Sequence, residues 1–532
     1  MAESRQIARP NQIIPIPSAV TPRAYRVLGI VFGALCLGSL AAGLYLAPEP
    51  TTLGLVLLGL GLPILLLFWH RPEVGLLALI FLSGSFVPPS IVDFRLPIGG
   101  GLDLRDMALI GLFGLVFLQQ LNRGTLKVPW WPVGGPLLLF LILAVFSTFY
   151  ALFFEHVESN WALGDLRILI LYLTFYIALW SIKRPEQLKT LLIGLFIVAN
   201  LTAMIIYLQQ FFGAGNPLLQ AMMVSRDWRV YELPGSVRVV PAGQVLMHFM
   251  WFVALGVLAL GRPNWRLKTL CAIQVLFLGG GHIYTYMRAQ WVALIIGLGL
   301  ALIVLVPRFK QRQARVAIIA GCVALVVAGV IVGAPLSQSF SSPFLAAISE
   351  RFGSILTPSD TSETQSLQWR SFEIEEALEA IRKQPITGVG LGNRYRPLSA
   401  HSSEASGSLT DGRVDSGRVS RFTRYVHNSY ASIAVKMGIT GLIALLWFCA
   451  AVLFIGFRVY RDLPDSEYKG VVLGILAAFV GLLEWSYFHA HLIKAESTAT
   501  IGLMVALVGS IAYNARVWAD TRQHMGSLPV KE

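Results

Sequence analysis

Apolar segments long enough to cross a membrane recur from one end of the chain to the other. Each runs for about 18 to 22 residues, and a helix of that length spans a hydrocarbon core of about 30 Å. Hydrophobic residues make up 55% of the 532 residues and charged residues only 13%, which excludes a string of soluble domains. The chain is therefore predicted to be an all-α, polytopic membrane protein.

We expect about 14 transmembrane helices, each bounded to within a few residues. They are predicted at residues 27–47, 52–69, 73–92, 107–121, 132–154, 164–182, 188–212, 241–260, 269–286, 289–306, 316–333, 434–457, 470–489 and 498–514. The first apolar run follows a polar tail, residues 1–26, and is too long for the apolar region of a cleavable signal peptide. It is predicted to be a signal anchor.

The short loops on the two sides of these spans differ in basic charge. One set carries most of the short-loop lysines and arginines, for example Arg71, Arg123 and Arg458. Short loops rich in Lys and Arg stay in the cytoplasm, so the tails 1–26 and 515–532 are both predicted to be cytoplasmic. This topology, rather than binding to nucleic acid, accounts for the net charge of +13.

Two loops on the opposite side are long, one at residues 213–240 and one at residues 334–427. The predicted order is transmembrane helices 1–11 over 27–333, an extracytoplasmic loop subdomain over 334–427, and helices 12–14 over 428–514. Nine of the ten basic residues in the larger loop are arginine. Arginine is preferred where a planar fork must hold phosphate or carboxylate oxygens.

An amphipathic helix of roughly 16 residues is predicted inside the larger loop. It is expected to lie across the membrane surface or across the transmembrane bundle, and Pro385 should end it. The positions that line one face at helical spacing are Leu367, Ser371, Ile374, Leu378 and Ile381, beside Trp369 and Ala377.

A glycine-rich turn, Gly388-Val389-Gly390-Leu391-Gly392, follows this helix. It does not match a nucleotide-binding fingerprint, because the third glycine comes one position early and a helix rather than a strand precedes it. Two interpretations remain open. The turn returns the helix to the bundle, or its backbone approaches a ligand as closely as only glycine allows.

His427 and Asn428 stand where the chain enters the twelfth apolar segment. Asn is a good N-cap, so one interpretation is a helix cap with a histidine at the membrane interface. The other interpretation is a general base. A helix N-terminus and nearby arginines disfavour the imidazolium, and a neutral imidazole can take a proton from a hydroxyl group.

Two arginines lie at the extracytoplasmic ends of adjacent predicted spans. Arg238 precedes Pro241, and Arg288 stands in a short turn between two apolar runs. One interpretation is that both are interfacial side chains that reach toward water. The other is that they clamp a diphosphate, with about 1.5–3 kcal/mol for each charge-assisted hydrogen bond.

The sequence predicts no cofactor and no metal site. All four cysteines, Cys36, Cys271, Cys322 and Cys449, fall inside apolar runs, which argues against a disulfide framework or a zinc site. No Asp-x-Asp pair that would suit a divalent cation is present.

The motifs, taken in chain order, resemble the O-antigen ligase and O-antigen (exopolysaccharide) polymerase superfamily. In that superfamily the pattern Pro-x-x-Gly-x-Gly-x-Gly precedes His-Asn-x-x, and Gly-x-x-Gly follows a few residues later. This chain has PITGVGLGN, then HNSY, then KMGITGL. The clear part of the resemblance covers Arg370 to Leu442, and a looser part extends back to Arg238. Lys436 stands where an acidic residue is frequent before Gly-x-x-Gly.

The resemblance implies a metal-independent membrane glycosyltransferase of the GT-C type in the bacterial inner (cytoplasmic) membrane, with its site on the periplasmic face. Its donor would be a glycan on polyprenyl (undecaprenyl) diphosphate, and its acceptor a hydroxyl group on a glycan or lipid. His427 matches the catalytic histidine, Arg238 and Arg288 match the diphosphate-binding arginines, and Arg370 matches a charged residue ahead of the loop helix. Further substrate-binding residues would be Asn428, Gly388, Gly390 and Gly392, which belong to the matching motifs.

Several alternatives remain open. A polymerase, a ligase and a protein O-glycosyltransferase share these motifs, and the many spans with a long loop favour a polymerase. A different class of protein, a transporter or flippase of lipid-linked oligosaccharides, would need ionisable residues at mid-membrane, for which Glu484, His248 and His282 are candidates. A catalytically inactive scaffold that binds polyprenyl lipid is the remaining possibility.

Overall fold

The computed structural model describes residues 67–84, 103–124, 127–212, 229–233, 236–240, 243–261, 264–305, 361–396 and 423–526. The chain divides into two compact units, residues 1–70 and 71–532. The second unit holds the helices and strands between residues 72 and 526. The predicted spans 27–47 and 316–333, most of 52–69, and most of the loop between residues 334 and 427 lie outside the described residues.

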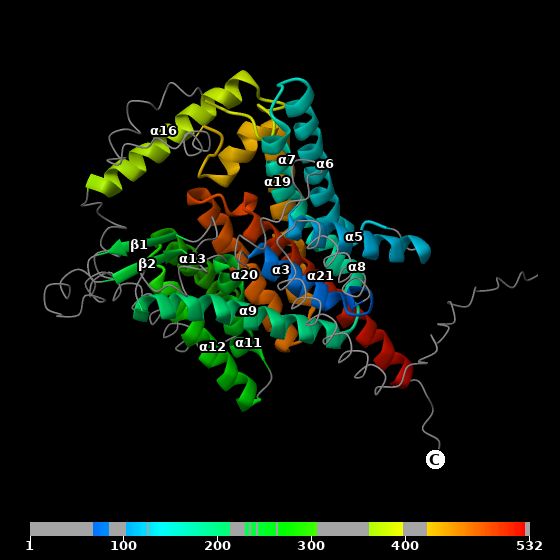
Figure 1. Ribbon diagram of the computed structural model, residues 1–532. Coiled ribbons are helices and arrows are strands. Elements are labelled where there is room, and N and C mark those ends of the chain that lie inside the picture. The colour runs from blue at the N-terminus through cyan, green and yellow to red at the C-terminus, as the bar shows by residue number, and fades with distance from the viewer. Residues whose placement is uncertain are drawn as a thin grey trace, which may run out of the picture. The chain divides into compact units, whose positions relative to one another are not determined.

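The described part of the second unit is built almost entirely of helices (Figure 1). They are α3 (Pro72–Ser83), α5 (Leu104–Asn122), α6 (Trp131–Phe153), α7 (Ser159–Ile170), the short η1 (Leu171–Leu173), α8 (Thr174–Ser181), α9 (Pro185–Phe212), α11 (Gln244–Leu260), α12 (Trp265–Tyr284), α13 (Arg288–Leu305), α16 (Thr361–Lys383), α19 (Ser429–Asp462), α20 (Glu467–Phe488), the short η4 (His491–Ile493) and α21 (Ala495–Gly526).

Within the described residues, nine helical segments are long and apolar enough to cross a membrane, and α3 and α11 are shorter apolar helices. Each of these eleven segments coincides with a span expected from hydropathy. The ends differ by a few residues, except that α3 ends at Ser83 whereas the span was expected to run to residue 92. The prediction of a polytopic helical membrane protein is therefore confirmed. The total of about 14 spans, the two cytoplasmic tails and the loop subdomain stay predictions.

The helices α11, α13 and α20 form the tightest part of the bundle because small residues let their backbones approach. A Cβ atom added to Gly256 on α11 would lie 2.1 Å from the carbonyl oxygen of Gly470 on α20. One added to Gly481 on α20 would lie 2.4 Å from the carbonyl oxygen of Ala293 on α13. Such contacts are typical of helices that associate in a membrane. There the hydrophobic effect does not drive association, and close packing of the backbones does.

A β-hairpin departs from the all-α prediction. β1 (Arg229–Leu233) pairs antiparallel with β2 (Ser236–Val240), and Tyr231 stands opposite Arg238. The segment was expected to be part of a long loop between two spans. Its valines and tyrosine favour strands, and a hairpin satisfies backbone groups locally.

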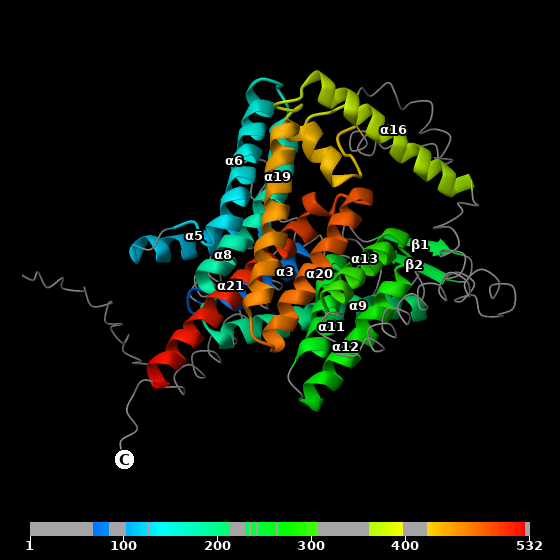
Figure 2. The same ribbon diagram turned by 180° about the vertical axis from the view of Figure 1, so that it is seen from behind.

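α16 crosses the end of the bundle at which α19 begins, as both views show (Figures 1 and 2). It has 23 residues, and Pro385 follows its last residue by two positions, as expected. The face that packs on the bundle includes Ala377 and Ala380, in a cluster with Val426 and Val435. Leu378, expected on the apolar face, is 47% exposed and lies away from this cluster.

Candidate active site

The glycine-rich turn is held by a break in α19. Gly438 has φ 70° and ψ −177° inside that helix, so the carbonyl groups just before it lose their helical partners. The turn supplies replacements: the N–H of Val389 donates to Val435 O at 2.8 Å, and that of Gly390 donates to Lys436 O at 3.0 Å. In return, the N–H of Ile439 donates to Pro385 O at 2.8 Å. The break and the turn therefore complete each other's backbone hydrogen bonds.

The three glycines of the turn are required by its contact with the bundle. Gly388, Gly390 and Gly392 have φ values of 65°, 90° and 74°, a region that other residues rarely adopt. A Cβ atom at Gly388 would lie 2.5 Å from the backbone of Gly438, and one at Gly392 would lie 2.4 Å from that of α7. Their N–H groups donate to Gln384 O, Lys436 O and an Asp165 carboxylate oxygen. These contacts require glycine at the three positions for packing alone. The substrate-binding role of the glycines stays a prediction.

Lys436 ties the same turn to α7. Its side chain is 4% exposed, and Nζ donates to Asn393 O at 2.5 Å and lies 3.8 Å from Asp165 Oδ2. Ser147 on α6 completes the junction, because its hydroxyl donates to Lys436 O and accepts the N–H of Leu391. A lysine at this motif position, where an acidic residue is frequent, thus has a structural partner in the acidic side chain of Asp165.

Asn428 caps α19. Its Oδ1 accepts the backbone N–H groups of Tyr430 and Ala431 at 2.9 and 3.0 Å, which satisfies two donors at the helix start. The residue is 7% exposed. The capping interpretation is therefore confirmed, and the additional role of Asn428 in substrate binding stays a prediction. The cap fixes the backbone of the preceding residue, His427, at the N-terminus of α19.

His427 is held by a carboxylate from α16. Its Nδ1 lies 2.8 Å from Glu373 Oε2, and its backbone N–H donates to the same oxygen at 3.3 Å. The imidazole is 30% exposed, whereas Glu373 is 1% exposed. Because Glu373 engages Nδ1, the other ring nitrogen, Nε2, is the one that can face a substrate. The edge of Tyr425 borders the ring, with the centroids 5.4 Å apart.

Glu373 is itself fixed on its other oxygen. Trp369 Nε1 donates to Glu373 Oε1 at 3.0 Å, and an Arg396 guanidinium nitrogen lies 3.9 Å from that atom. The Arg396 side chain is fully buried and lies over the rings of Trp369 and Tyr395, with centroid distances of 5.1 and 5.2 Å. A buried carboxylate needs such compensation to stay charged. The site thus contains a His–carboxylate pair of the kind that orients a general base.

One of the predicted arginines, Arg370, stands on the same helix as Glu373, and the charge of a second, Arg288, acts on it. Arg370 precedes Glu373 by one helical turn, and Arg288 begins α13. Burial lowers the pKa of Arg370; the charge of Glu373 opposes this effect, and the charge of Arg288 lowers the pKa further. Two positive charges that act on each other in this way favour an anion in their neighbourhood. Arg238 lies on β2, and its side chain is outside what the structure describes.

Glu373 and Arg396 were not singled out from the sequence. Glu373 stands in a helix with four further glutamates, Glu363, Glu375, Glu376 and Glu379, so its residue type carries no signal. Only its distance of three residues from Arg370, on the same face of the helix, could have pointed to it. Arg396 lies beyond the glycine turn, where no periodic pattern guides an assignment.

The residues that suggested a transporter belong to α11, α12 and α20. His248 on α11 and His282 on α12 are fully buried, with ring centroids 6.0 Å apart. His248 Nε2 lies 3.1 Å from Ala478 O, and His282 Nδ1 lies 2.6 Å from Gln290 Nε2. Glu484 lies on the neighbouring α20. No cluster of three His, Cys, Asp or Glu side chains that could hold a metal ion is present in the described part of the chain.

Fold and site together define a polytopic membrane protein with a His–carboxylate pair at one end of its bundle. Residues 273–446 match the family model described as O-antigen ligase, which confirms the resemblance expected from the motifs. The matched range contains Arg288, Arg370, Glu373, the glycine turn and His427, and Arg238 precedes it. No curated protein matches the chain.

Proposed function

We propose that the protein is a glycosyltransferase that moves a glycan from a polyprenyl diphosphate to an acceptor hydroxyl group. The observation that carries the proposal is the contact of His427 Nδ1 with Glu373, one helical turn from the arginine pair. It joins a base to a cationic site, and the match of residues 273–446 to the O-antigen ligase family supports the same chemistry.

His427 acts as the general base. Its Nε2 takes the proton of the acceptor hydroxyl group as the oxygen attacks the anomeric carbon of the donor. The new bond joins that oxygen to the anomeric carbon. The bond from the anomeric carbon to the phosphate oxygen breaks, and polyprenyl diphosphate leaves with the electron pair. Glu373 stabilises the positive charge that the imidazole gains.

Arg288 and Arg370 hold the diphosphate, with Arg238 as the third predicted ligand. A diphosphate develops negative charge as it leaves, and guanidinium groups placed at that point stabilise it. The bound diphosphate also compensates the positive charges of the two arginines, which favours donor binding. We propose that the site faces the periplasm across the bacterial inner membrane. The site lies at the end of the bundle from which the long loop 334–427 emerges, and a loop of that length can be extracytoplasmic in spite of its arginines.

The test uses the purified protein, a polyprenyl-diphosphate oligosaccharide, and candidate acceptors offered one at a time. A ladder of lengthening lipid-linked products identifies a polymerase, and a single addition to a lipid core or a protein identifies a ligase or a protein O-glycosyltransferase. Movement of the lipid-linked oligosaccharide across sealed vesicles with no acceptor present, and no transfer in any arm, contradicts the proposal and identifies a transporter.

A further inference from the structure

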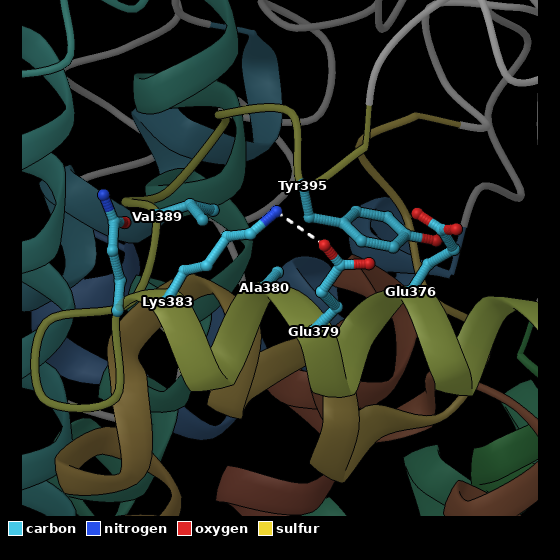
Figure 3. A pocket seen from close by; sticks show the side chains of 7 residues that line it. Glu376, Glu379, Ala380, Lys383, Val389 and Tyr395 are labelled. Atoms are coloured by element: carbon cyan, nitrogen blue, oxygen red, sulfur yellow. Dashed lines mark hydrogen bonds and ion pairs between the residues drawn. The ribbon is translucent and has the colours of Figure 1, made fainter.

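A cavity of ≈ 360 Å³ lies between the C-terminal half of α16 and the segment that follows it (Figure 3). This volume is at the lower end of the range for small-ligand sites, about 300–1,000 Å³. Side chains of α16 project toward Tyr395 and Val389, which form the facing wall. The residues that line the cavity are Glu376, Glu379, Ala380, Lys383, Gln384, Val389 and Tyr395.

The lining suits a neutral, hydroxyl-rich ligand. Glu376 and Glu379 offer carboxylate oxygens that accept hydrogen bonds from hydroxyl groups, and Tyr395 offers a ring face. Lys383 is paired with Glu379 at 2.6 Å, and both of these side chains are more than half exposed, so the pair forms the rim. The lining contains two carboxylates, Glu376 and Glu379, and one lysine, so its net charge is negative. A negative charge disfavours a phosphate or another anion.

Gln384 lines the cavity, and its side chain is held by Glu155. Its Nε2 donates to Glu155 at 3.2 Å, while its Oε1 is buried and has no hydrogen-bond partner among the residues that the structure describes. Because Oε1 is enclosed by protein atoms, the carboxylates of Glu376 and Glu379 are the side-chain acceptors of the lining that a ligand in the cavity can reach.

Along α16, the cavity lies on the opposite side of Glu373 from Arg370. Arg370 precedes Glu373 on α16 by roughly 4.5 Å of helix rise, and the cavity begins at Glu376, roughly 4.5 Å beyond it, at 1.5 Å per residue. Tyr395 connects the two places, since its hydroxyl lies 3.5 Å from the carbonyl oxygen of Tyr425, which borders the His427 ring. An acceptor hydroxyl group must reach His427 from the side away from the diphosphate.

We infer that this cavity is the acceptor subsite and binds a neutral sugar residue of the acceptor glycan. The inference rests on the proposed function and adds the substrate class that its acceptor side takes. The donor diphosphate occupies the arginine end of α16, and the acceptor sugar occupies the glutamate end. His427 lies between the two, next to Glu373.

The experiment measures transfer by the full-length protein to two soluble probes: the oligosaccharide freed from its lipid by mild acid, and deacylated lipopolysaccharide core. The better probe for the wild type is then used with Glu376→Gln and with Glu379→Trp, which places a large ring over the exposed rim of the cavity. Both variants should raise the KM for the probe at least tenfold. The kcat and the affinity for polyprenyl diphosphate should stay within twofold of wild type, which also shows that the variants are folded.

Glu375→Gln is the matched control, because Glu375 lies on α16 with its side chain exposed and outside the cavity lining. It should leave the KM for the probe unchanged. An unchanged KM in Glu376→Gln and Glu379→Trp overturns the acceptor subsite while the proposed function stands. If the wild type glycosylates none of the three acceptors, that is, the two soluble probes and a lipid-linked acceptor, both the proposed function and this inference are overturned.

Discussion

Glu373 and His427, 54 positions apart in the chain, meet through a contact of 2.8 Å between Oε2 and Nδ1. The contact joins α16 to the start of α19. It fixes which ring nitrogen of the histidine is available, and it places a negative charge where the ring becomes positive during proton transfer. The proposed activity therefore depends on this pair and on the parts of the chain that hold it in place.

Glu373→Gln should lower the kcat of glycan transfer by about 10²-fold or more, because the ring loses the charge that stabilises its protonated form. The affinity for polyprenyl diphosphate should change little, since the arginines remain. Single-turnover assays and donor-binding measurements on the same preparation separate the two effects. Glu375→Gln, an equal loss of charge on the exposed face of α16, should behave as wild type. A kcat for Glu373→Gln equal to that of the control would show that the carboxylate does not assist the base.

Arg370→Ala should weaken the binding of polyprenyl diphosphate about 10- to 100-fold, which corresponds to the loss of one charge-assisted hydrogen bond of about 1.5–3 kcal/mol. Arg370→Lys should restore little of this loss, because a lysine has no planar fork. Arg382→Ala removes an exposed arginine of the same helix and should have no effect. Equal affinities for Arg370→Ala and Arg382→Ala would contradict the diphosphate assignment.

Arg288→Ala should show the same weakening, and the double variant should lose less than the sum of the two single losses. The reason is that each arginine disfavours the charge of the other in the empty site. A double-mutant cycle on the donor dissociation constant measures this coupling. Strictly additive losses would show that the two guanidinium groups do not share one ligand.

Gly438→Ala should destabilise the protein, because the new Cβ atom would lie 2.0 Å from the carbonyl oxygen of Ile386, in a backbone region that alanine rarely adopts. We expect a loss of at least about 1–3 kcal/mol, seen as a lower unfolding temperature in detergent. Gly114→Ala on α5 is the control, since a Cβ atom there meets nothing within 4 Å. It should be neutral or slightly stabilising. Equal unfolding temperatures for the two variants would contradict the described break in α19.

Lys436→Met should loosen the glycine turn from α7, because the donor to Asn393 O is lost and Asp165 loses its nearest cation. Backbone amides between residues 388 and 393 should exchange with deuterium faster than in wild type. Lys469→Met removes a similarly buried lysine at the other end of α19, where Nζ donates to Leu463 O, and should leave exchange in the turn unchanged. If the two variants show the same exchange, Lys436 does not hold the turn.

Much of this architecture follows from the chain alone, for reasons that differ from element to element. The spans were predictable because a membrane imposes one length and one composition on each of them, so α9 and α20 lie where hydropathy places them. α16 was predictable as an amphipathic helix that ends before Pro385. Its contact face was predicted in part: Ala377 and Ile381 pack on the bundle as expected, whereas Ala380 was not expected there and Leu378 is left exposed.

The site was predictable only in part. His427 and Arg370 belong to motifs, whereas Glu373 acts through a contact that spans 54 positions and stands among similar glutamates. The role of Gly388 as a packing residue depends on the break at Gly438, which no local pattern announces. The hairpin that carries Arg238 was missed because its strands have only five residues each, too few for their periodicity to distinguish a strand from a loop.

The assignment of His427 as the general base is tested most directly by His427→Ala in a paired measurement. The purified variant is given a polyprenyl-diphosphate oligosaccharide with its acceptor, and both donor binding and product formation are followed beside the wild type. We predict donor affinity within a fewfold of wild type and transfer lowered by about 10²- to 10⁴-fold, the range of general acid–base catalysis. Transfer at the wild-type rate with unchanged donor affinity would contradict the assignment of His427 as the base.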